Sequence, residues 1–405
     1  MKILHVSENL VEGGLERMLH LLCIGLGRRG HANVILHGRL EDKDIPPEGV
    51  DAVCVDGVTA PQCSNLAARL AGVEEVVRQH APDVVVMHHV RQPALVEVLR
   101  RAAPCVRMVH DVGFVCPEGR KTLRRGTRSG APELCPHPVG YACQMRAYVH
   151  RCMPRHPAKG LPIIARLRRM LALHRGGVHM AVPSRFMRAM LVHNGFDPTA
   201  VTVLPHFLSA TQTPDGPQGG QHIVFVGRVN KGKGVDVLLD AAARMTLPAR
   251  VSIVGDGPDL APMRERAQAL GLGERVVFHG WLERDRVRRV MRGADVVAAP
   301  SLCPEAFCLM GLEAMALALP VVAARSGAIP EWLDHGRTGL FVPPGDADAL
   351  AHALDDILSD PHRARDMGWA GYHDLVDHFD EGAGIARWER FLRHVSEGTD
   401  GQEGG

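Results

Sequence analysis

Short apolar runs alternate with helix-length segments along almost the whole chain. Helical patterns cover Leu15–Arg28, Leu66–Gln79 and Phe186–His193, and Ser184 is the expected N-cap of the last. In the first half, the runs that predict strands are Lys2–Val6, Asn33–Leu36, Ala52–Val55, Val84–Met87, Cys105–Val109, Val178–Val182 and Val201–Leu204. This alternation predicts βαβ units and a parallel sheet.

Residues 206–221 interrupt the pattern, because they hold two Pro, three Gly and no periodicity, as a linker does. The alternation then restarts, with strands expected near residues 223, 250, 275, 294, 320 and 339. We therefore expect an α/β fold of two doubly wound Rossmann-like domains that face a central cleft. Ligands of such sheets bind at the carboxyl ends of the strands.

The pattern divides the chain into an ordered series of parts. They are an N-terminal domain (1–207, with an insertion at 111–175), a linker (208–221), a C-terminal domain (222–378), a C-terminal helix (379–395) and a tail (396–405). A return of the C-terminal helix to the N-terminal domain is one option. The tail is polar and rich in Gly, which predicts disorder.

Composition narrows the possible functions. The net charge is +2 and only 4% of residues are aromatic, so neither a basic field nor stacking platforms favour nucleic acid as a partner. No apolar run approaches the ~18 residues of a membrane span. The first ten residues are too short in apolar length for a signal peptide and predict a strand. The ten cysteines are expected to be reduced thiols, as in a cytoplasmic protein.

Glycine-rich loops follow several predicted strands. Gly13 and Gly14 lie where a loop enters a helix, an arrangement that can bind an anion or be a plain turn. In "FVGRVNKGKG", Gly227 precedes Arg228 and Lys233, two cations that suit a diphosphate or simply face solvent. "VGDGPDL" lacks the third glycine of a dinucleotide fingerprint, so its first glycine, Gly255, predicts a tight turn beside a nucleotide and not NAD binding.

Two glutamates stand eight positions apart in "PEAFCLMGLEAMALALP". Pro304 precedes Glu305, and a helix is expected from Phe307 to Ala318, so that Glu313 lies about two turns inside it. This spacing suits a ligand with hydroxyl groups at both ends and a diphosphate between them. The alternative is that Glu305 caps the helix and Glu313 pairs with a neighbouring Arg.

Several segments together resemble one known family. "PSLCPEAFCLMGLEAMALALPVVAARSGAIPEW", "GRTGLFVPPGD", "GRVNKGKGVDVLLDAA" and "EGGLERML" are similar to the signature segments of retaining GT-B glycosyltransferases of family 4. The resemblance covers nearly the whole chain. It departs from the family pattern at Ala306 and Cys308, where glycine is usual, and this leaves the donor open.

The resemblance implies roles by position. Arg228 and Lys233 would stabilise the donor diphosphate, and Glu305 with the amides around Phe307, Cys308 and Leu309 would bind the donor sugar. The remaining implied contacts are Glu313 with the ribose, Gly13 and Gly14 with the diphosphate, and His110 with the reacting sugar.

The implied reaction moves a sugar, with retention, from a UDP- or GDP-sugar to a glycan or lipid-linked acceptor in cell-surface polysaccharide or glycoconjugate synthesis. The implied route is front-face substitution with no cofactor beyond the nucleotide-sugar substrate. A nucleotide-sugar-binding protein without turnover, an epimerase and a phosphorylase with the same fold are the alternatives.

The insertion at 111–175 carries two further features. Its four cysteines, Cys116, Cys135, Cys143 and Cys152, lack the paired spacing of a zinc ribbon, so reduced thiols are favoured over a metal cluster. Sixteen Lys and Arg against three acids lie between residues 100 and 175, and residues 160–175 predict a basic amphipathic helix. Such a helix can bind an anionic membrane at the inner face, or it can lie solvated over the acceptor groove.

Overall fold

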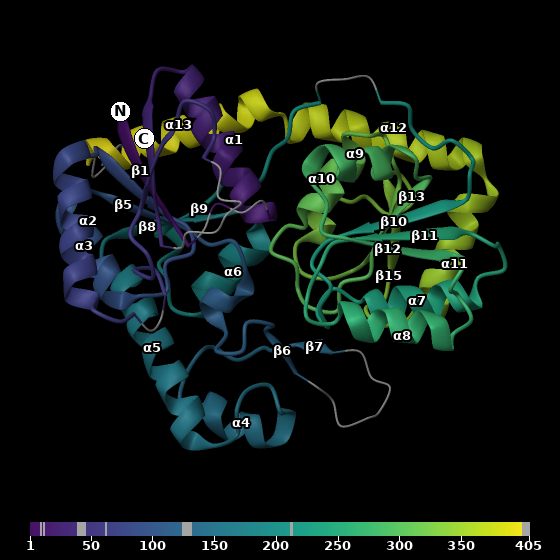
Figure 1. Cartoon of the computed structure of the whole chain (residues 1–405), viewed down its shortest axis with the longest axis horizontal. Helices are drawn as coiled ribbons and strands as arrows, with labels where there is room; N and C mark the ends of the chain where they lie inside the picture. The colour runs from purple at the N-terminus through teal and green to yellow at the C-terminus, as the bar shows by residue number, and fades with distance from the viewer. Residues whose placement is uncertain are drawn as a thin grey trace.

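The computed structural model describes residues 1–8, 10, 13–38, 46–60, 63–123, 132–210 and 214–398. Two parallel sheets lie side by side, one from each half of the chain, and each is covered by helices on both faces (Figure 1). This arrangement confirms the expected fold class of two doubly wound domains.

The first sheet has the strand order β3-β2-β1-β4-β5-β8-β9, and all its strand pairs are parallel. Its strands are β1 (Lys2–Ser7), β2 (Ala32–His37), β3 (Asp51–Cys54), β4 (Val84–Met87), β5 (Cys105–Met108), β8 (Val178–Val182) and β9 (Val201–Val203). All seven strands predicted in this half are present, and the central strand β4 is a fully buried apolar run of the kind that is visible in a sequence.

Helices of the first half connect these strands. They are α1 (Gly14–Arg28), α2 (Leu66–His80), α3 (Pro93–Ala102), η1 (Val112–Val115), α4 (Ala142–His150), α5 (Pro157–Arg175), α6 (Arg185–His193) and η2 (Pro198–Ala200). The hydroxyl of Ser184 accepts a hydrogen bond from the Met187 N–H at 3.1 Å, which confirms the predicted N-cap of α6.

The second sheet has the order β12-β11-β10-β13-β14-β15 and is also parallel. Its strands are β10 (His222–Val226), β11 (Arg250–Val254), β12 (Val276–Gly280), β13 (Val296–Ala299), β14 (Val321–Ala324) and β15 (Gly339–Val342). The helices of this half are α7 (Val235–Arg244), α8 (Leu260–Ala269), α9 (Arg284–Arg292), α10 (Leu309–Met315), η3 (Ile329–Glu331), α11 (Ala347–Ser359), α12 (Pro361–His378) and α13 (Glu381–Glu397).

Helix α10 is shorter than predicted. It begins at Leu309 and ends at Met315, whereas the sequence predicted Phe307–Ala318. Cys308 precedes it with φ of 74°, a left-handed conformation that no helical residue has, and Ala318 beyond its end has φ of 51°. The prediction that Glu305 precedes the helix is confirmed, but Glu313 lies about one turn into α10 and not two.

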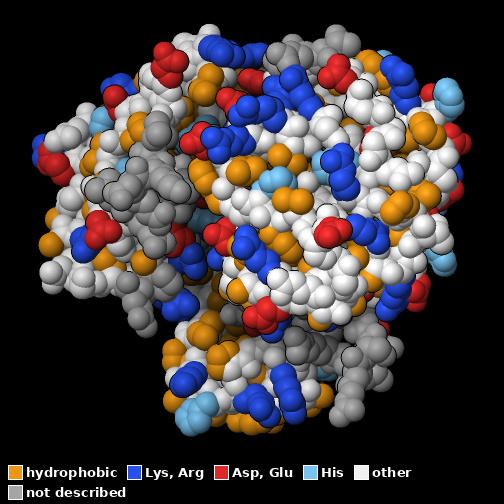
Figure 2. All heavy atoms as spheres, turned by 45° about the vertical axis from the view of Figure 1, so that its right-hand side comes forward, with side chains coloured by type: hydrophobic (Ala, Val, Ile, Leu, Met, Phe, Trp, Pro, Cys, Tyr) orange, Lys and Arg blue, Asp and Glu red, His pale blue; other side chains and the backbone are white. Residues whose placement is uncertain are grey.

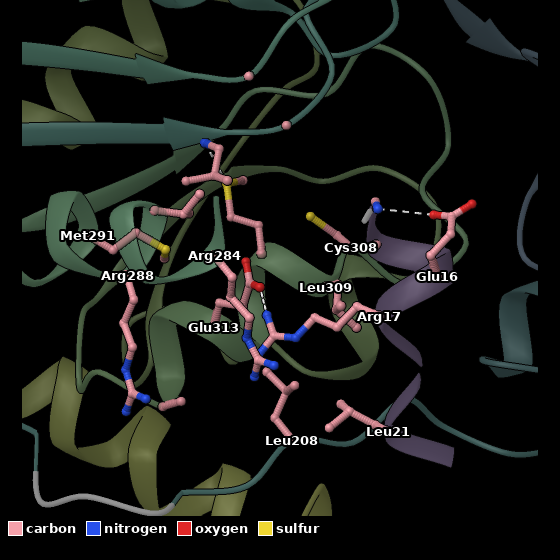
Figure 3. Close-up of a pocket in the computed structure, with 18 of the residues that line it drawn as sticks. Glu16, Arg17, Leu21, Leu208, Arg284, Arg288, Met291, Cys308, Leu309 and Glu313 are labelled. Carbon is pink, nitrogen blue, oxygen red and sulfur yellow. Dashed lines mark hydrogen bonds and ion pairs between the residues drawn. The ribbon is translucent and has the colours of Figure 1, made fainter. Parts of the chain in front are cut away.

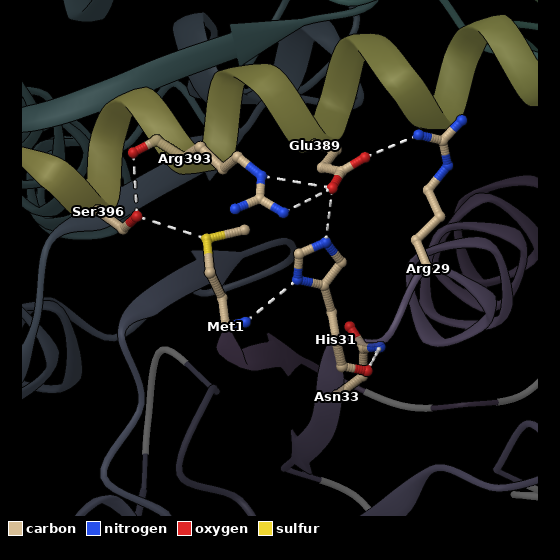
Figure 4. Close-up of polar contacts among 7 residues, drawn as sticks. All are labelled: Met1, Arg29, His31, Asn33, Glu389, Arg393 and Ser396. Atoms are coloured by element: carbon tan, nitrogen blue, oxygen red, sulfur yellow. Dashed lines mark hydrogen bonds and ion pairs between the residues drawn. The ribbon is translucent and has the colours of Figure 1, made fainter.

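The last helix crosses to the first sheet. Helix α13 packs on α1, with Ile385 and Trp388 in a shared core with Met18 and Leu22. At its surface Glu389 accepts hydrogen bonds from Arg29 (2.7 Å), His31 (3.0 Å) and Arg393 (2.9 Å) (Figure 4). The helix continues through Ser396 and Glu397, past the predicted start of a disordered tail, and residues 399–405 lie outside the described part.

The insertion forms a lobe beside the first domain. Helix α4 packs on α5, and a short hairpin of β6 (Thr122–Leu123) and β7 (Glu133–Leu134) lies next to them (Figure 1). The predicted basic helix is part of α5, whose buried side packs on α3 and β8, so α5 also serves as the crossover between β5 and β8. No described helix is long and apolar enough to cross a membrane.

Candidate active site

A cleft of about 1630 Å³ lies between the two domains. The α1, β10–α7 and α10 segments all contribute to its walls. Ten of the twelve residues singled out in the sequence line it: Gly13, Gly14, Gly227, Arg228, Lys233, Gly255, Glu305, Cys308, Leu309 and Glu313. The structure therefore brings loops from both domains together, as parallel sheets that face one another should.

Lys233 and Glu305 meet inside the cleft. The Lys233 Nζ lies 2.7 Å from Glu305 Oε1, which also accepts a hydrogen bond from the Ser301 hydroxyl at 2.5 Å. The two side chains are 33% and 12% exposed. Burial alone would lower the pKa of Lys233, but the Glu305 carboxylate outweighs burial and leaves that pKa raised. The amine is therefore a cation at neutral pH.

The loops behind this pair are fixed by backbone contacts. The N–H groups of Leu302 and Cys303 donate to the Gly232 carbonyl at 2.8 and 3.1 Å, which ties the Lys233 loop to the Glu305 loop. The Ala328 N–H donates to the Glu305 carbonyl at 2.8 Å. A Cβ at Gly327, whose φ is +59°, would lie 2.2 Å from the Glu305 carbonyl oxygen, so only glycine allows this approach.

Gly255 packs equally closely against the strand end of β10. Its φ is +131°, and a Cβ there would lie 2.0 Å from the Gly227 carbonyl oxygen. The predicted tight turn after β11 is present, and it lets two glycine loops, at Gly227 and Gly255, lie side by side in the cleft wall.

Glu313 pairs with a residue that the sequence analysis did not single out. Arg17, on α1, forms an ion pair with the Glu313 carboxylate across the cleft (Figure 3). The alternative of a neighbouring Arg is therefore realised in this structure, with the partner coming from the other domain. The sequence alone does not predict this ion pair, because Arg17 and Glu313 are far apart in the chain and only the packing of α1 against α10 brings their side chains together.

Gly13 and Gly14 form the entrance to α1. The Gly13 N–H donates to the buried Glu16 carboxylate at 3.1 Å, as in a capping box. Burial raises the pKa of Glu16. A Cβ at Gly14 would meet no atom within 4 Å, so this position faces open space in the cleft.

Further arginines line the cleft beyond those predicted. Arg284 and Arg288 lie four residues apart on one face of α9 (Figure 3). Together with Arg228 they have no acidic partner within the part of the chain that the structure describes. The i, i+4 spacing in "RDRVRRVMR" was the available signal. Three such cations suit a ligand that carries several negative charges.

His110 and Phe307 do not line this cleft; they lie next to it. Phe307 is buried, and its carbonyl accepts a hydrogen bond from the Trp332 indole at 2.5 Å. The ring of His206 lies between the two, 6.1 Å from the His110 ring and 5.2 Å from the Phe307 ring. The link from His110 to the cleft is His89, which lines it and whose ring is 6.1 Å from that of His110.

The two domains also touch beside the cleft. Ser184 donates to the Ala306 carbonyl at 2.7 Å, and the Glu331 carboxylate accepts from the N–H groups of Arg185 and Phe186 at 2.8 and 2.7 Å. Glu331 thus caps the N-terminus of α6 from the opposite domain. These contacts hold the Glu305 loop against the first domain.

The four cysteines of the insertion all line one small cavity near α4 and the β6–β7 hairpin. They are free thiols, and Cys116 Sγ accepts from the Lys121 N–H at 3.3 Å. Within the described ranges, no group of three or more His, Cys, Asp or Glu is placed to hold a metal ion.

Comparison with known proteins shows which family models and which relatives this chain matches. Residues 12–212 match the model of Glycosyltransferase Family 4, and residues 213–374 match that of Glycosyl transferases group 1. A D-inositol 3-phosphate glycosyltransferase of Mycobacteroides abscessus is 36% identical over 365 residues, which cover 85% of this chain and 77% of the relative.

A second relative matches over a shorter stretch. The GDP-mannose-dependent alpha-(1-6)-phosphatidylinositol monomannoside mannosyltransferase of Mycolicibacterium smegmatis is 37% identical over 166 residues, which are 39% of this chain and 44% of that protein. The match therefore spans less than half of the length of that relative.

Two solved structures share the fold. Anabaena HepE in complex with UDP and glucose has a TM-score of 0.72 and 18% identity, and the match covers 97% of this chain and 99% of that chain. Sucrose-phosphate synthase from Thermosynechococcus elongatus has a TM-score of 0.73 and 19% identity, with coverage of 98% and 100%. Together with the family models and the full-length relative, they show that this chain is a GT-B glycosyltransferase and belongs to glycosyltransferase family 4.

Proposed function

We propose that this glycosyltransferase is a retaining hexosyltransferase that uses a UDP- or GDP-sugar as donor. The acceptor is a glycan or a lipid-linked sugar in cell-surface polysaccharide or glycoconjugate synthesis. One observation carries the proposal: the Lys233–Glu305 pair lines the cleft beside the Gly227 and Gly255 loops, together with Arg228, which has no acidic partner among the described residues. A relative named as GDP-mannose-dependent and a fold neighbour in complex with UDP and glucose support a nucleotide sugar as donor.

The charged side chains in the cleft suggest a separate chemical role for each residue. Arg228 and Lys233 stabilise the negative charge that develops on the departing diphosphate, and Glu305 orients Lys233 and accepts hydrogen bonds from the sugar. The leaving diphosphate takes the proton of the attacking hydroxyl, so front-face substitution needs no protein base. Because cations of the chain supply the charge, we propose that no cofactor is required.

The experiment is a panel of UDP-, GDP- and ADP-sugars. The correct donor raises the melting temperature of the purified enzyme, and the released nucleotide is measured with and without a glycan or lipid-linked acceptor. Proton NMR of the product then gives its anomeric configuration. Stabilisation without turnover would indicate a binding protein, and phosphate-dependent or epimerised products would indicate the two enzyme alternatives.

We further propose that the enzyme is cytoplasmic and binds the anionic inner face of a membrane through α4 and the start of α5. Six of the ten large hydrophobic side chains that are exposed among the described residues lie on this lobe: Leu134, Tyr141, Met145, Tyr148, Val149 and Leu161. Arg151, Arg155 and Lys159 are exposed beside them. Hydrophobic and basic side chains are mixed on the lobe at the bottom of Figure 2. Apolar anchors with flanking cations suit an anionic lipid surface.

Two arginines of the predicted basic helix are engaged within the protein. Arg169 donates to Glu97 at 2.8 Å, and Arg168 lies over the Tyr141 ring at 4.3 Å. The test therefore uses Met145→Asp with Val149→Asp, which are 69% and 76% exposed, and Val376→Asp as a control on another exposed surface. Binding to anionic vesicles that is lost only in the double variant supports the proposal, and equal binding of all three proteins overturns it.

A further inference from the structure

One polar residue from each of four adjacent strands forms a line across the first sheet. Asn33 lies on β2, His5 on β1, His88 directly after β4 and His110 two residues after β5, in the order in which these strands pair. His5 Nε2 is 3.2 Å from Asn33 Oδ1, His5 Nδ1 is 3.3 Å from His88 Nε2, and His88 Nδ1 is 3.0 Å from His110 Nε2.

Asn33 sets the direction of this line. Its Nδ2 donates to the carbonyl oxygens of Cys23 (3.1 Å) and His31 (3.3 Å). A flipped amide would place Oδ1 against these two oxygens, which cannot donate, so Oδ1 faces His5. Because Oδ1 only accepts, the hydrogen between Asn33 and His5 belongs to His5 Nε2.

The assignment passes from ring to ring, because a neutral imidazole has one donor and one acceptor nitrogen. His5 Nδ1 accepts, so His88 Nε2 carries the next hydrogen, and His88 Nδ1 in turn accepts from His110 Nε2. The rings are neutral: burial lowers the pKa of His5 to about 4 and holds the pKa values of His88 and His110 well below the usual range. The nearby Arg107 cation adds to the effect at His88 and His110.

The line ends on an acceptor with no donor. By this assignment His110 Nδ1 carries a lone pair, and it is buried without a hydrogen-bond partner among the described residues. Native proteins seldom leave such an atom unsatisfied. The His110 ring lies between His206 and His89, and His89 faces the cleft. Because His110 lies next to the cleft, a hydroxyl group of a bound ligand is a suitable donor for this atom.

We propose that Asn33, His5 and His88 are positioning residues that fix His110 in the Nε2–H tautomer, so that His110 Nδ1 accepts a hydrogen bond from a hydroxyl group of the donor sugar. The sugar contact rests on the proposed function, whereas the tautomers follow from the fold. We call the hydrogen-bonded line from Asn33 through His5 and His88 to His110 the relay. The relay gives His110 a defined polarity, because His110 Nδ1 can accept a hydrogen bond from the sugar but cannot donate one to it.

The first test reads the tautomers directly. Long-range proton–nitrogen spectra of the full chain labelled with ¹⁵N-histidine show which ring nitrogen carries hydrogen, and the His110 signals are assigned by their loss in His110→Asn. We expect Nε2–H for His5, His88 and His110 at neutral pH. A hydrogen on Nδ1 of any of the three, or an imidazolium, overturns the relay.

A substitution at Asn33 tests what sets the direction. Asn33→Leu removes the acceptor that faces His5 and should give mixed tautomers at His110; an unchanged His110 signal in a folded Asn33→Leu protein overturns the role of Asn33. If this variant does not fold, the wild-type spectrum still decides.

Activity supplies the second test. His88→Phe keeps ring packing but breaks the relay, so kcat/KM should fall about tenfold, as for loss of one oriented hydrogen bond. His88→Gln, whose amide can donate to His5 and accept from His110, should recover most of it. An equal loss in both variants overturns positioning by hydrogen bonds. A wild-type enzyme that turns over no nucleotide sugar would refute the proposed function and leave the spectra to judge the relay.

Discussion

Arg17 on α1 and Glu313 on α10 form an ion pair that joins the two domains across the cleft (Figure 3). Their side chains are only 16% and 20% exposed. Ion pairs that are partly removed from water hold their partners more firmly than surface pairs. A ribose that binds Glu313 must therefore compete with Arg17 for the carboxylate.

Because of this competition, substitutions of Glu313 and of Arg17 should change the KM of the donor by different amounts. If Glu313 binds the ribose, Glu313→Gln should raise the KM of the donor at least about tenfold, or about 1.4 kcal/mol of binding. Arg17→Gln should change the KM less, because it removes only the competitor. Steady-state kinetics of both single variants and the double variant check this. Equal effects that do not add in the double variant would mean that the pair only holds the domains together.

The Lys233–Glu305 pair should control turnover. Lys233→Ala or Glu305→Ala is expected to lower kcat at least ~100-fold, as loss of a charge contact in the transition state can do. Lys231→Ala is the matched control, since Lys231 is exposed on the same loop and does not line the cleft. Near-wild-type kcat in folded Lys233→Ala protein would refute the assignment.

A substitution of Gly14 should affect binding of the donor without affecting the stability of the fold. Neither Gly13 nor Gly14 has positive φ, so the backbone does not require glycine there, and a Cβ at Gly14 would enter open cleft space. Gly14→Ala should therefore leave the melting temperature unchanged or higher, since Ala favours helices, while the Kd of the donor rises about tenfold. Gly27→Ala, on the same helix away from the cleft, should not change the Kd. Unchanged affinity in Gly14→Ala would exclude close approach of the ligand.

The sheets could be predicted from the sequence because the burial of a strand leaves a signal within a few consecutive residues. Buried parallel strands need continuous apolar runs, and runs such as Val84–Met87 stand out between polar segments. Apolar content misled the prediction at the end of α10. Residues 316–318 are apolar but form a turn, in which Ala318 has φ of 51° and its carbonyl oxygen would lie 1.8 Å from a Cβ at Gly368.

The loops of the site could be predicted from the sequence, but the contacts between the two domains could not, because those contacts are not local. Glycines, Lys233 and Glu305 stand in recognisable loops, whereas Arg17 acquires its partner only when the two domains pack. In the insertion α5 was predicted as the basic helix, but α4 was not predicted, because few apolar positions of α4 face inward. Long-range contacts and exposed apolar faces carry no periodic signal that a single sequence can show.

Cys308 has a backbone conformation that favours glycine. Its φ of 74° places a side chain in the left-handed region at the start of α10. Cys308→Gly should therefore unfold with a free energy about 1 kcal/mol higher than that of Cys308→Ala, although alanine is normally the more stabilising residue. Denaturant titrations of both variants measure this difference. A more stable Cys308→Ala protein would show that the φ is relaxed at no cost.

Glu389 should make the docking of α13 sensitive to acid. Hydrogen bonds from Arg393, His31 and Arg29 lower the pKa of Glu389 from 4.5 to about 2. A carboxylate whose pKa is lower in the folded state stabilises the fold above its unfolded pKa, and this contribution is lost as the pH falls from 4.5 to about 2. Glu389→Gln should therefore lower the melting temperature at pH 7 by about 2–4 °C. This difference should shrink below about pH 4. Glu397→Gln, an exposed carboxylate on the same helix, should show neither effect. A difference for Glu389→Gln that stays constant down to about pH 3 would contradict the assigned ionisation, and thermal scans across this range decide it.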